Sequence, residues 1–191
     1  MKKIILMAIV ALFSMTSCST YNKMVSQEEA VNSAWSNVET QYQRRADLIP
    51  NLVATVKGYA SHEESTLQAV VDARAKATSI NLTADNISAD KLTEYQQAQS
   101  SVTSALGRLI AVSENYPDLK ANQNFLELQA QLEGTENRIT VARKGYNDAA
   151  QAYNVTIRKF PANIVAMIFS FDVKPYYEAD AGASAAPKVE F

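Results

Sequence analysis

The sequence predicts an all-α protein, an elongated antiparallel four-helix bundle in up-down-up-down order with a kinked first helix and a short C-terminal apolar segment. Three observations predict this class. The 191 residues include only five glycines and five prolines, apolar residues recur every three or four positions along four long stretches, and short polar connections separate the stretches. Since short connections make successive helices antiparallel neighbours, the four apolar stripes can cover one another. A coiled coil with a partner chain is the alternative.

The first helix is expected to span residues 26 to 60 and to continue through Pro50. Ser26-Gln27-Glu28-Glu29 has the pattern of a capping box, which predicts the helix start. The apolar stripe keeps one phase on both sides of the proline, through Val31, Trp35, Val38, Tyr42, Ile49, Leu52, Val56 and Tyr59. Two separate helices would have no reason to share a phase. We therefore expect one helix with a kink, because Pro50 leaves the Ala46 carbonyl without its donor at a cost of roughly 3 kcal/mol.

The same patterns predict three further helices. A second capping box, Ser61-His62-Glu63-Glu64, is expected to open a helix that ends near residue 80. After a polar loop, the third helix is expected from about residue 90 to 115, where Tyr116-Pro117-Asp118 ends it. The fourth is expected from about 119 to 159, with Phe160 on its apolar stripe and Pro161 as its stop.

The N-terminal residues predict a lipoprotein signal. Lys2 and Lys3 precede an apolar run at residues 4 to 13, which is shorter than the ~20 residues that cross a bilayer. Cys18, the sole cysteine, follows. We predict a signal peptide at residues 1–17, acylation of Cys18 and a lipid-anchored linker at 18–25. An ordinary signal peptide with an incidental cysteine is the alternative. Residues 26–178 would form the bundle, and the small, polar residues 179–191 a disordered tail.

One polar residue interrupts each apolar stripe at a similar level. The interruptions are Arg45, Arg74, Gln99, and Thr135 or Glu136. Counted outward from the turns, they agree in level to within about one helical turn. We therefore predict a buried polar layer at the kink, formed by Arg45, Arg74, Gln99 and Glu136, in which Glu136 pairs with an arginine and a spare donor reaches the Ala46 carbonyl. The alternative is that Arg45 extends its charge to water along its stem.

The two ends of the predicted rod carry different candidate surfaces. Helices one and four extend furthest toward Cys18, so their stripes need a cover there. The apolar segment at residues 161–171 either folds back onto this pair or presents its side chains to a membrane or partner: Ile164, Val165, Met167, Ile168, Phe169 and Phe171. The opposite tip is either a docking surface or a set of ordinary helix caps, and carries His62, Glu63, Tyr116 and Lys120.

Several stretches carry a pattern specific to one family. They are Trp35 and Val38, "YQRRADLIPNLVATVKGYASHE", Ala73-Arg74, "YPDLKANQNFLELQAQLEGTENRI", "ARKGYNDAAQAYN" and the Phe160-Pro161 to Phe171 segment. Over about residues 30 to 177 the chain resembles the LemA family of bacterial membrane-associated proteins. The resemblance implies a long helical bundle, usually tethered by one transmembrane helix, in whose place this chain offers Cys18. It implies no catalytic residues, and for some members an association with membrane-embedded metalloproteases or envelope stress.

Composition and motifs argue against an enzyme or a nucleic-acid binder. A net charge of -2 offers no basic face. The single histidine, His62, lacks the second histidine four residues on that a zinc helix requires, and no P-loop or dinucleotide motif occurs. We predict a non-enzymatic, cofactor-free adaptor or scaffold for a protein partner, anchored on the periplasmic face of the cell envelope. The alternatives are a membrane-surface sensor that uses residues 161–171, and a small-molecule site beside Pro50.

Overall fold

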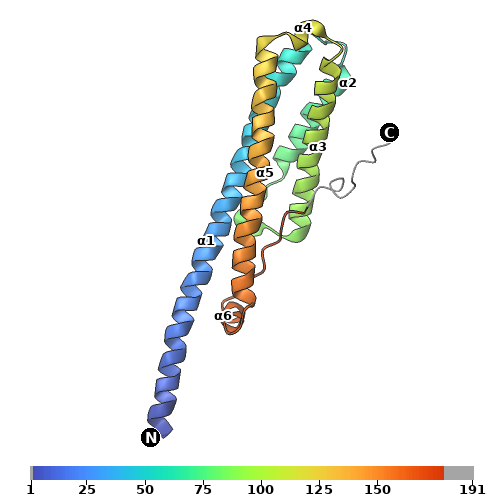
Figure 1. The fold of residues 1–191 in the computed structure, drawn as a ribbon. Helices are drawn as coiled ribbons and strands as arrows, with labels where there is room; N and C mark the ends of the chain where they lie inside the picture. The colour runs from blue at the N-terminus through green and yellow to red at the C-terminus, as the bar shows by residue number, and fades with distance from the viewer. Residues whose placement is uncertain (1, 179–191) are drawn as a thin grey trace, which may run out of the picture.

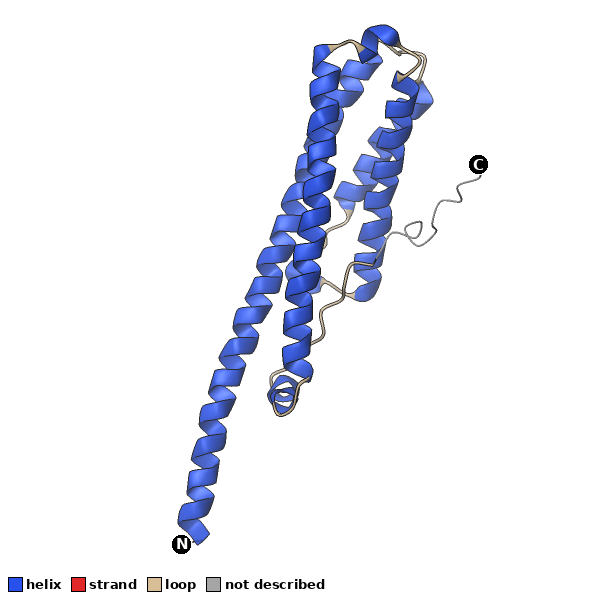
Figure 2. Ribbon diagram, in the orientation of Figure 1, coloured by secondary structure: helices blue, strands red, loops and turns tan. Residues whose placement is uncertain are grey.

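The computed structural model describes the backbone of residues 2–178 and the side chains of residues 18–178. Over this range the protein contains six α-helices, one short 3-10 helix and no strand (Figure 2). The prediction of an all-α protein is therefore confirmed. The tail expected at 179–191 lies outside the described residues, as do the side chains of the predicted signal peptide.

The first helix, α1, spans Lys2–Lys57 and passes through Pro50 without ending, as the shared phase predicted. Its predicted start was wrong. Ser26 is an exposed residue in the middle of α1 rather than its cap. The physical reason is that no glycine or proline occurs between residues 1 and 49, so nothing ends the helix between the apolar run at residues 4 to 13 and the bundle.

The second helix begins later than its capping pattern predicted, and the third begins close to its predicted residue. α2 spans Glu64–Ser79, and Glu63 precedes it without a side-chain capping bond, so the expected box at Ser61 does not form. The short helix η1 spans Ala84–Asn86 in the following loop. α3 spans Ala89–Ser113 and is capped by Ser88, whose hydroxyl accepts a hydrogen bond from the Lys91 amide at 3.4 Å.

The predicted fourth helix is divided into two pieces. α4 spans Pro117–Lys120 and α5 spans Gln123–Arg158. The break falls at Asn122, whose side-chain oxygen accepts from the Phe125 amide at 3.0 Å and so caps α5. A short helix, α6, spans Ala162–Ile168. Residues 171–178 follow it without regular secondary structure.

The long helices pack in pairs. α1 lies along α5, α2 lies along α3, and α1 also contacts α2. Figure 1 shows the chain rising through α1, descending through α2, rising through α3 and descending through α5. α1 and α5 extend below α2 and α3, as their predicted lengths required, and α6 lies at the lower end of α5 (Figure 1).

The interior is divided into two clusters of buried apolar residues. The upper core holds α1 positions 49 to 56, Ala60 in the following turn, the buried faces of α2 and α4, α3 from 98 to 109, and Phe125 and Leu132 of α5. The lower core holds α1 positions 24 to 42, α5 positions 139 to 157, and residues of the α2–α3 loop, the start of α3, α6 and the C-terminal segment. Two residues expected on the stripes lie outside both: Tyr59 is 44% exposed and Phe160 is 81% exposed, because each lies beyond the last turn of its helix.

Candidate functional site

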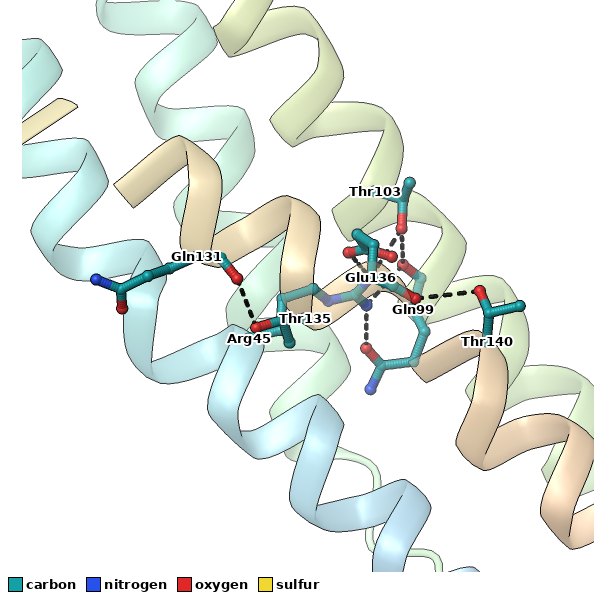
Figure 3. Close-up of polar contacts among 7 residues, drawn as sticks. All are labelled: Arg45, Gln99, Thr103, Gln131, Thr135, Glu136 and Thr140. Atoms are coloured by element: carbon teal, nitrogen blue, oxygen red, sulfur yellow. Dashed lines mark hydrogen bonds and ion pairs between the residues drawn. The ribbon is translucent and has the colours of Figure 1, made fainter. Parts of the chain in front are cut away.

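Arg45 lies between the two cores and is almost completely buried, with 2% of its surface exposed. Its Nη1 donates to Glu136 Oε1 at 2.7 Å and to Thr103 Oγ1 at 2.8 Å. Its Nη2 donates to the Gln99 side-chain oxygen at 2.5 Å and to the Gln99 carbonyl at 3.1 Å. Figure 3 shows these partners converging on the guanidinium from α3 and α5. Arg45 therefore does not reach water, and one arginine joins three helices.

The carbonyl that Pro50 leaves without a helical donor has a partner on another helix. Arg74 of α2 donates from Nε to the Ala46 carbonyl at 2.7 Å. Arg74 thus takes the place of the missing N–H of Pro50, while Glu136 bonds to Arg45. The structure brings all four residues of the predicted polar layer to the same level, in two adjoining groups. Thr103, a further partner of Arg45, was missed because it lies off the α3 apolar stripe.

The two candidates on α5 have different roles. Thr135 is fully buried and donates to the Gln131 carbonyl of its own helix at 2.7 Å (Figure 3). Glu136 keeps 38% of its side chain exposed while it pairs with Arg45. Because water still reaches this carboxylate, the ion pair does not bear the full desolvation penalty of a buried pair. The layer fixes the relative positions of α1, α3 and α5.

A recess open to solvent, with about 150 Å³ of space for water-sized molecules, lies beside this layer. Its walls come from α1, α2, α3 and the loop after α2, and include Arg45, Arg74, Glu39 and Tyr95. Burial raises the pKa of the Glu39 carboxyl above its ordinary value. The recess therefore combines two arginines, both already hydrogen-bonded, with one carboxylate that ionises less readily than usual.

At the upper tip, two of the four predicted docking residues pair with each other. The Tyr116 hydroxyl donates to Glu63 Oε1 at 3.0 Å, and this bond raises the pKa of Tyr116. Lys120 forms an ion pair with Glu114. His62 is exposed in the turn before α2. The tip thus offers one exposed histidine beside side chains that largely bind one another.

At the opposite end, the six predicted apolar residues of 161–171 divide between the interior and the surface. Val165 is buried, and Ile164 and Phe171 are half-buried. Met167, Ile168 and Phe169 are 77%, 65% and 56% exposed. Both phenylalanine rings contact Tyr21 of α1, with centroids 4.8 and 5.6 Å away. Cys18, the predicted lipid attachment site, is a free, exposed cysteine on α1 near this end.

The lower core is closed by a segment that the sequence reading missed. Residues 172–178, here called the strap, lie against α5 and are held by two asparagines. Asn154 donates to the Lys174 carbonyl at 2.8 Å and accepts from the Lys174 amide at 2.9 Å. Asn147 bonds Tyr177 in the same way, at 3.0 and 2.8 Å. The available signal was the two asparagines seven residues apart on the inward-facing side of α5, one of them buried.

Trp35 connects the strap to the rest of the lower core. Its Nε1 donates to the Leu82 carbonyl in the α2–α3 loop at 3.2 Å. Its ring lies 5.7, 5.6 and 6.1 Å from those of Tyr95, Tyr146 and Tyr177. Burial raises the pKa of Tyr146 to about 12. The stripe is therefore covered jointly. Val165 and Ala166 of α6 fold onto the helix pair, as predicted for residues 161–171, and the loop and the strap cover the rest.

Comparison with known proteins identifies the family. The LemA family profile matches residues 34–191. The chain belongs to the LemA family. It is 30% identical over 188 residues to Magnetosome protein MamQ 2 of Paramagnetospirillum magneticum, covering 88% of this chain and 68% of that protein. It is also 30% identical to Magnetosome protein MamQ of Magnetospirillum gryphiswaldense, covering 89% and 69%. Protein LemA of Metamycoplasma hominis is 28% identical over 145 residues, covering 76% and 63%.

In the described part of this LemA-family chain, no cluster of three or more histidine, cysteine, aspartate or glutamate side chains could hold a metal. Among the helices described, none has a stretch both long and apolar enough to cross a membrane. What the LemA-family structure does provide is a long helix pair, a polar layer that fixes register, and two ends with different surfaces.

Proposed function

We propose that this LemA-family chain is a non-enzymatic adaptor, anchored by lipid at Cys18 to a membrane of the cell envelope, with the periplasm as its location. In this proposal α1, α2, α3 and α5 act as one up-down-up-down four-helix bundle. The bundle holds a protein-docking tip, around His62, Glu63, Tyr116 and Lys120, away from the membrane. Family membership supports the proposal, as do the names of the MamQ relatives, which refer to a magnetosome rather than to a reaction.

The observation that carries the proposal is the continuity of α1. Cys18 and Lys57 belong to one helix, and at ~1.5 Å per residue they are roughly 60 Å apart along its axis. The bonds of Arg45 to α3 and α5 prevent α1 from sliding against its neighbours. A helix of this length, fixed in register, holds the tip at a set distance from the anchored end.

The anchor is tested by Cys18→Ser in the full chain, expressed in cells with metabolic labelling by a fatty-acid probe. We expect the label and the membrane fraction of the wild-type protein to be lost together in this variant. Ser17→Ala, next to the cysteine, is the matched control and keeps both. If the wild-type protein takes up no fatty-acid label, the proposed lipid anchor at Cys18 is wrong.

The tip is tested by photocrosslinking in living cells. His62 is the better probe position because it is exposed, whereas Tyr116 is half-buried and bonded to Glu63. We expect one discrete protein product from a photoreactive residue at position 62, and none from the control position Val141, which is 71% exposed midway along α5. Equal products at both positions would count against a docking tip.

A second candidate function, a membrane-surface sensor, is favoured by exposed apolar residues in and just before α6. Phe160, Met167 and Ile168 lie near the Cys18 end of the rod, beside the exposed Arg158 and Lys159. Flotation of Cys18→Ser protein with anionic vesicles tests it without the lipid anchor. We expect Met167→Glu and Ile168→Glu to reduce co-flotation several-fold and Val141→Glu to leave it unchanged. Deleting residues 161–191 is a poor test, because that would remove buried Val165, Ala166 and Tyr177 from the lower core.

A further inference from the structure

The main chain of the strap makes most of its hydrogen bonds to the bundle. Seven hydrogen bonds join the backbone of residues 174 to 178 to side chains of the bundle. Besides the four bonds of the two asparagines, Tyr146 donates to the Pro175 carbonyl at 3.0 Å. Arg143 and Gln96 both donate to the Glu178 carbonyl, at 3.0 and 3.1 Å. Main-chain contacts of this kind do not depend on the sequence that is bound.

The spacing of the two asparagines matches an extended peptide. Positions 147 and 154 are seven residues apart on α5, which is about 10.5 Å along the helix axis. Residues 174 and 177 are three apart, which is about 10 Å in an extended chain. A helix uses its own backbone groups internally, so it cannot pair with a strand directly. An asparagine side-chain amide carries an N–H donor beside a carbonyl acceptor, as a peptide group does, so Asn147 and Asn154 can bond the strap backbone where the helix backbone cannot.

Two side-chain positions add selectivity to this main-chain recognition. Lys174 forms an ion pair with Glu28 of α1 at 2.9 Å. Its Nζ also lies 5.8 Å from the Tyr153 ring centroid. Three residues later the Tyr177 ring lies against Trp35, with the Arg143 guanidinium 4.9 Å from its centroid. The groove therefore accepts a cation at the first position and an aromatic ring at the second.

The strap is an imperfect occupant of its own groove. The Tyr177 hydroxyl is buried and has no hydrogen-bond partner, and a buried hydroxyl without a partner weakens binding. A phenylalanine at this position would keep the ring contacts with Trp35 and Tyr146 and avoid that penalty. An extended segment with phenylalanine should bind roughly tenfold more tightly than the same segment with tyrosine.

We propose that the groove lined by Asn147, Asn154, Glu28 and Trp35 is a peptide-binding site for a partner protein, and that the strap occupies it until the partner displaces it. The segment it takes is extended and carries a lysine or arginine three residues before a phenylalanine. This inference rests on the adaptor function proposed above and names the chemistry that the partner contributes. The attached strap is present at a high effective concentration. A partner segment therefore displaces it only if it binds the groove more tightly than the strap does.

The test uses the full chain with a specific protease site inserted between residues 171 and 172. The strap is cut only after folding, so a failure to fold is separated from a failure to bind. The probes are fluorescent peptides, DVKPYYE, which is the strap sequence, and DVKPYFE, and binding is measured by anisotropy. We expect the cut protein to bind both, the phenylalanine peptide about tenfold more tightly, and the uncut protein to bind far more weakly.

Two controls separate main-chain recognition from simple hydrophobic filling. N147L/N154L protein, cut in the same way and folded by circular dichroism, should bind neither peptide. A peptide N-methylated at the phenylalanine cannot donate to Asn147 and should lose most of its affinity. Equal binding of the methylated and plain peptides overturns the proposal, as does a cut, folded protein that binds neither.

A further outcome assigns the groove differently. If the uncut chain forms concentration-dependent dimers that exchange straps, the occupant is a second copy and the proposed partner segment is wrong. The outcome is independent of the test at the tip. A discrete crosslink from position 62 together with failed peptide binding leaves the adaptor in place without this groove, and peptide binding without a crosslink at the tip moves the docking surface to the groove.

Discussion

The upper and lower cores of the same bundle are closed in different ways. The upper core is aliphatic apart from Phe125, and regular helices surround it. The lower core contains Trp35 and five buried tyrosines, and the α2–α3 loop, α6 and the strap complete it. Where helices lie on every side, branched aliphatic side chains fill the space. Where two helices continue beyond their neighbours, large rings and main-chain hydrogen bonds cover the exposed flank.

The boundary between the two cores coincides with Arg45. On α1 the upper core begins at Ile49 and the lower core ends at Tyr42. On α5 the same division falls between Leu132 and Ile139, around Thr135 and Glu136. A polar layer at this level prevents the apolar stripes from sliding by one turn, since any shift would bury Arg45 without its partners. The comparison therefore predicts that the halves respond differently to substitution.

The largest effect is expected from removing the hub of the lower core. Trp35→Ala should lower the free energy of unfolding by about 4 kcal/mol, because it leaves a cavity and frees the strap and the α2–α3 loop. Leu109→Ala in the upper core should cost about 3 kcal/mol and leave the strap in place. Urea unfolding measures the free energy of unfolding of both variants. Hydrogen exchange at residues 172–178 shows whether the strap stays in place. Equal loss of protection in both variants would show that the two cores form one cooperative unit.

The next effect tests the boundary itself. Arg45→Ala should cost about 3 kcal/mol, because it leaves the buried Gln99 side-chain oxygen without its donor and removes the ion-pair partner of Glu136. Arg44→Ala is the matched control, since Arg44 is exposed on the adjacent position, and should change stability by less than about 0.5 kcal/mol. A double-mutant cycle with Glu136→Gln measures the ion-pair coupling. If Arg45→Ala destabilises the protein no more than Arg44→Ala does, the polar layer does not contribute to stability.

A smaller effect tests the helix at Pro50. Arg74→Ala should cost about 1 to 2 kcal/mol by leaving the Ala46 carbonyl without a donor. Pro50→Ala in that background supplies the missing N–H to the same carbonyl, so it should restore most of the loss. Thermal unfolding of the two single variants and the double variant measures this. If Pro50→Ala gives the same change with and without Arg74, the two residues do not share the carbonyl.

The smallest effect concerns pH in the recess beside the layer. Burial raises the pKa of Glu39, so the folded protein binds a proton at this carboxyl more tightly than the unfolded chain does. Stability from that group is present below the ordinary glutamate pKa of about 4.3 and is lost as pH rises through the raised value. Glu39→Gln should therefore raise the melting temperature near pH 7 and have no such benefit near pH 4. Glu29→Gln, at an exposed position, is the control.

The candidate site was partly predictable because helices carry strict periodicity. The polar interruptions on each stripe identified Arg45, Arg74, Gln99 and Glu136, since level along a helix follows from counting residues at ~1.5 Å each. Counting also indicated that a donor would be needed at Ala46. Thr103 lay outside this reasoning, because it is reached only by the length and direction of the Arg45 side chain. The helix starts at Ser26 and Ser61 were wrong, because a capping pattern is only a local preference. The helix runs on through Ser26, whereas residues 61 to 63 stay in a turn and α2 begins at Glu64.

The sequence by itself determined the helical class, the passage of one helix through Pro50, and the level at which polar groups meet. The first two depend on contacts between residues close in the chain. The third depends on the regular rise of a helix, which lets position along it be counted from the sequence. Only the tertiary structure decided how the lower core is closed: Trp35 with Leu82, and Asn147 and Asn154 with the strap. Those bonds join segments without periodicity, and an irregular segment takes its conformation from the surface it packs against.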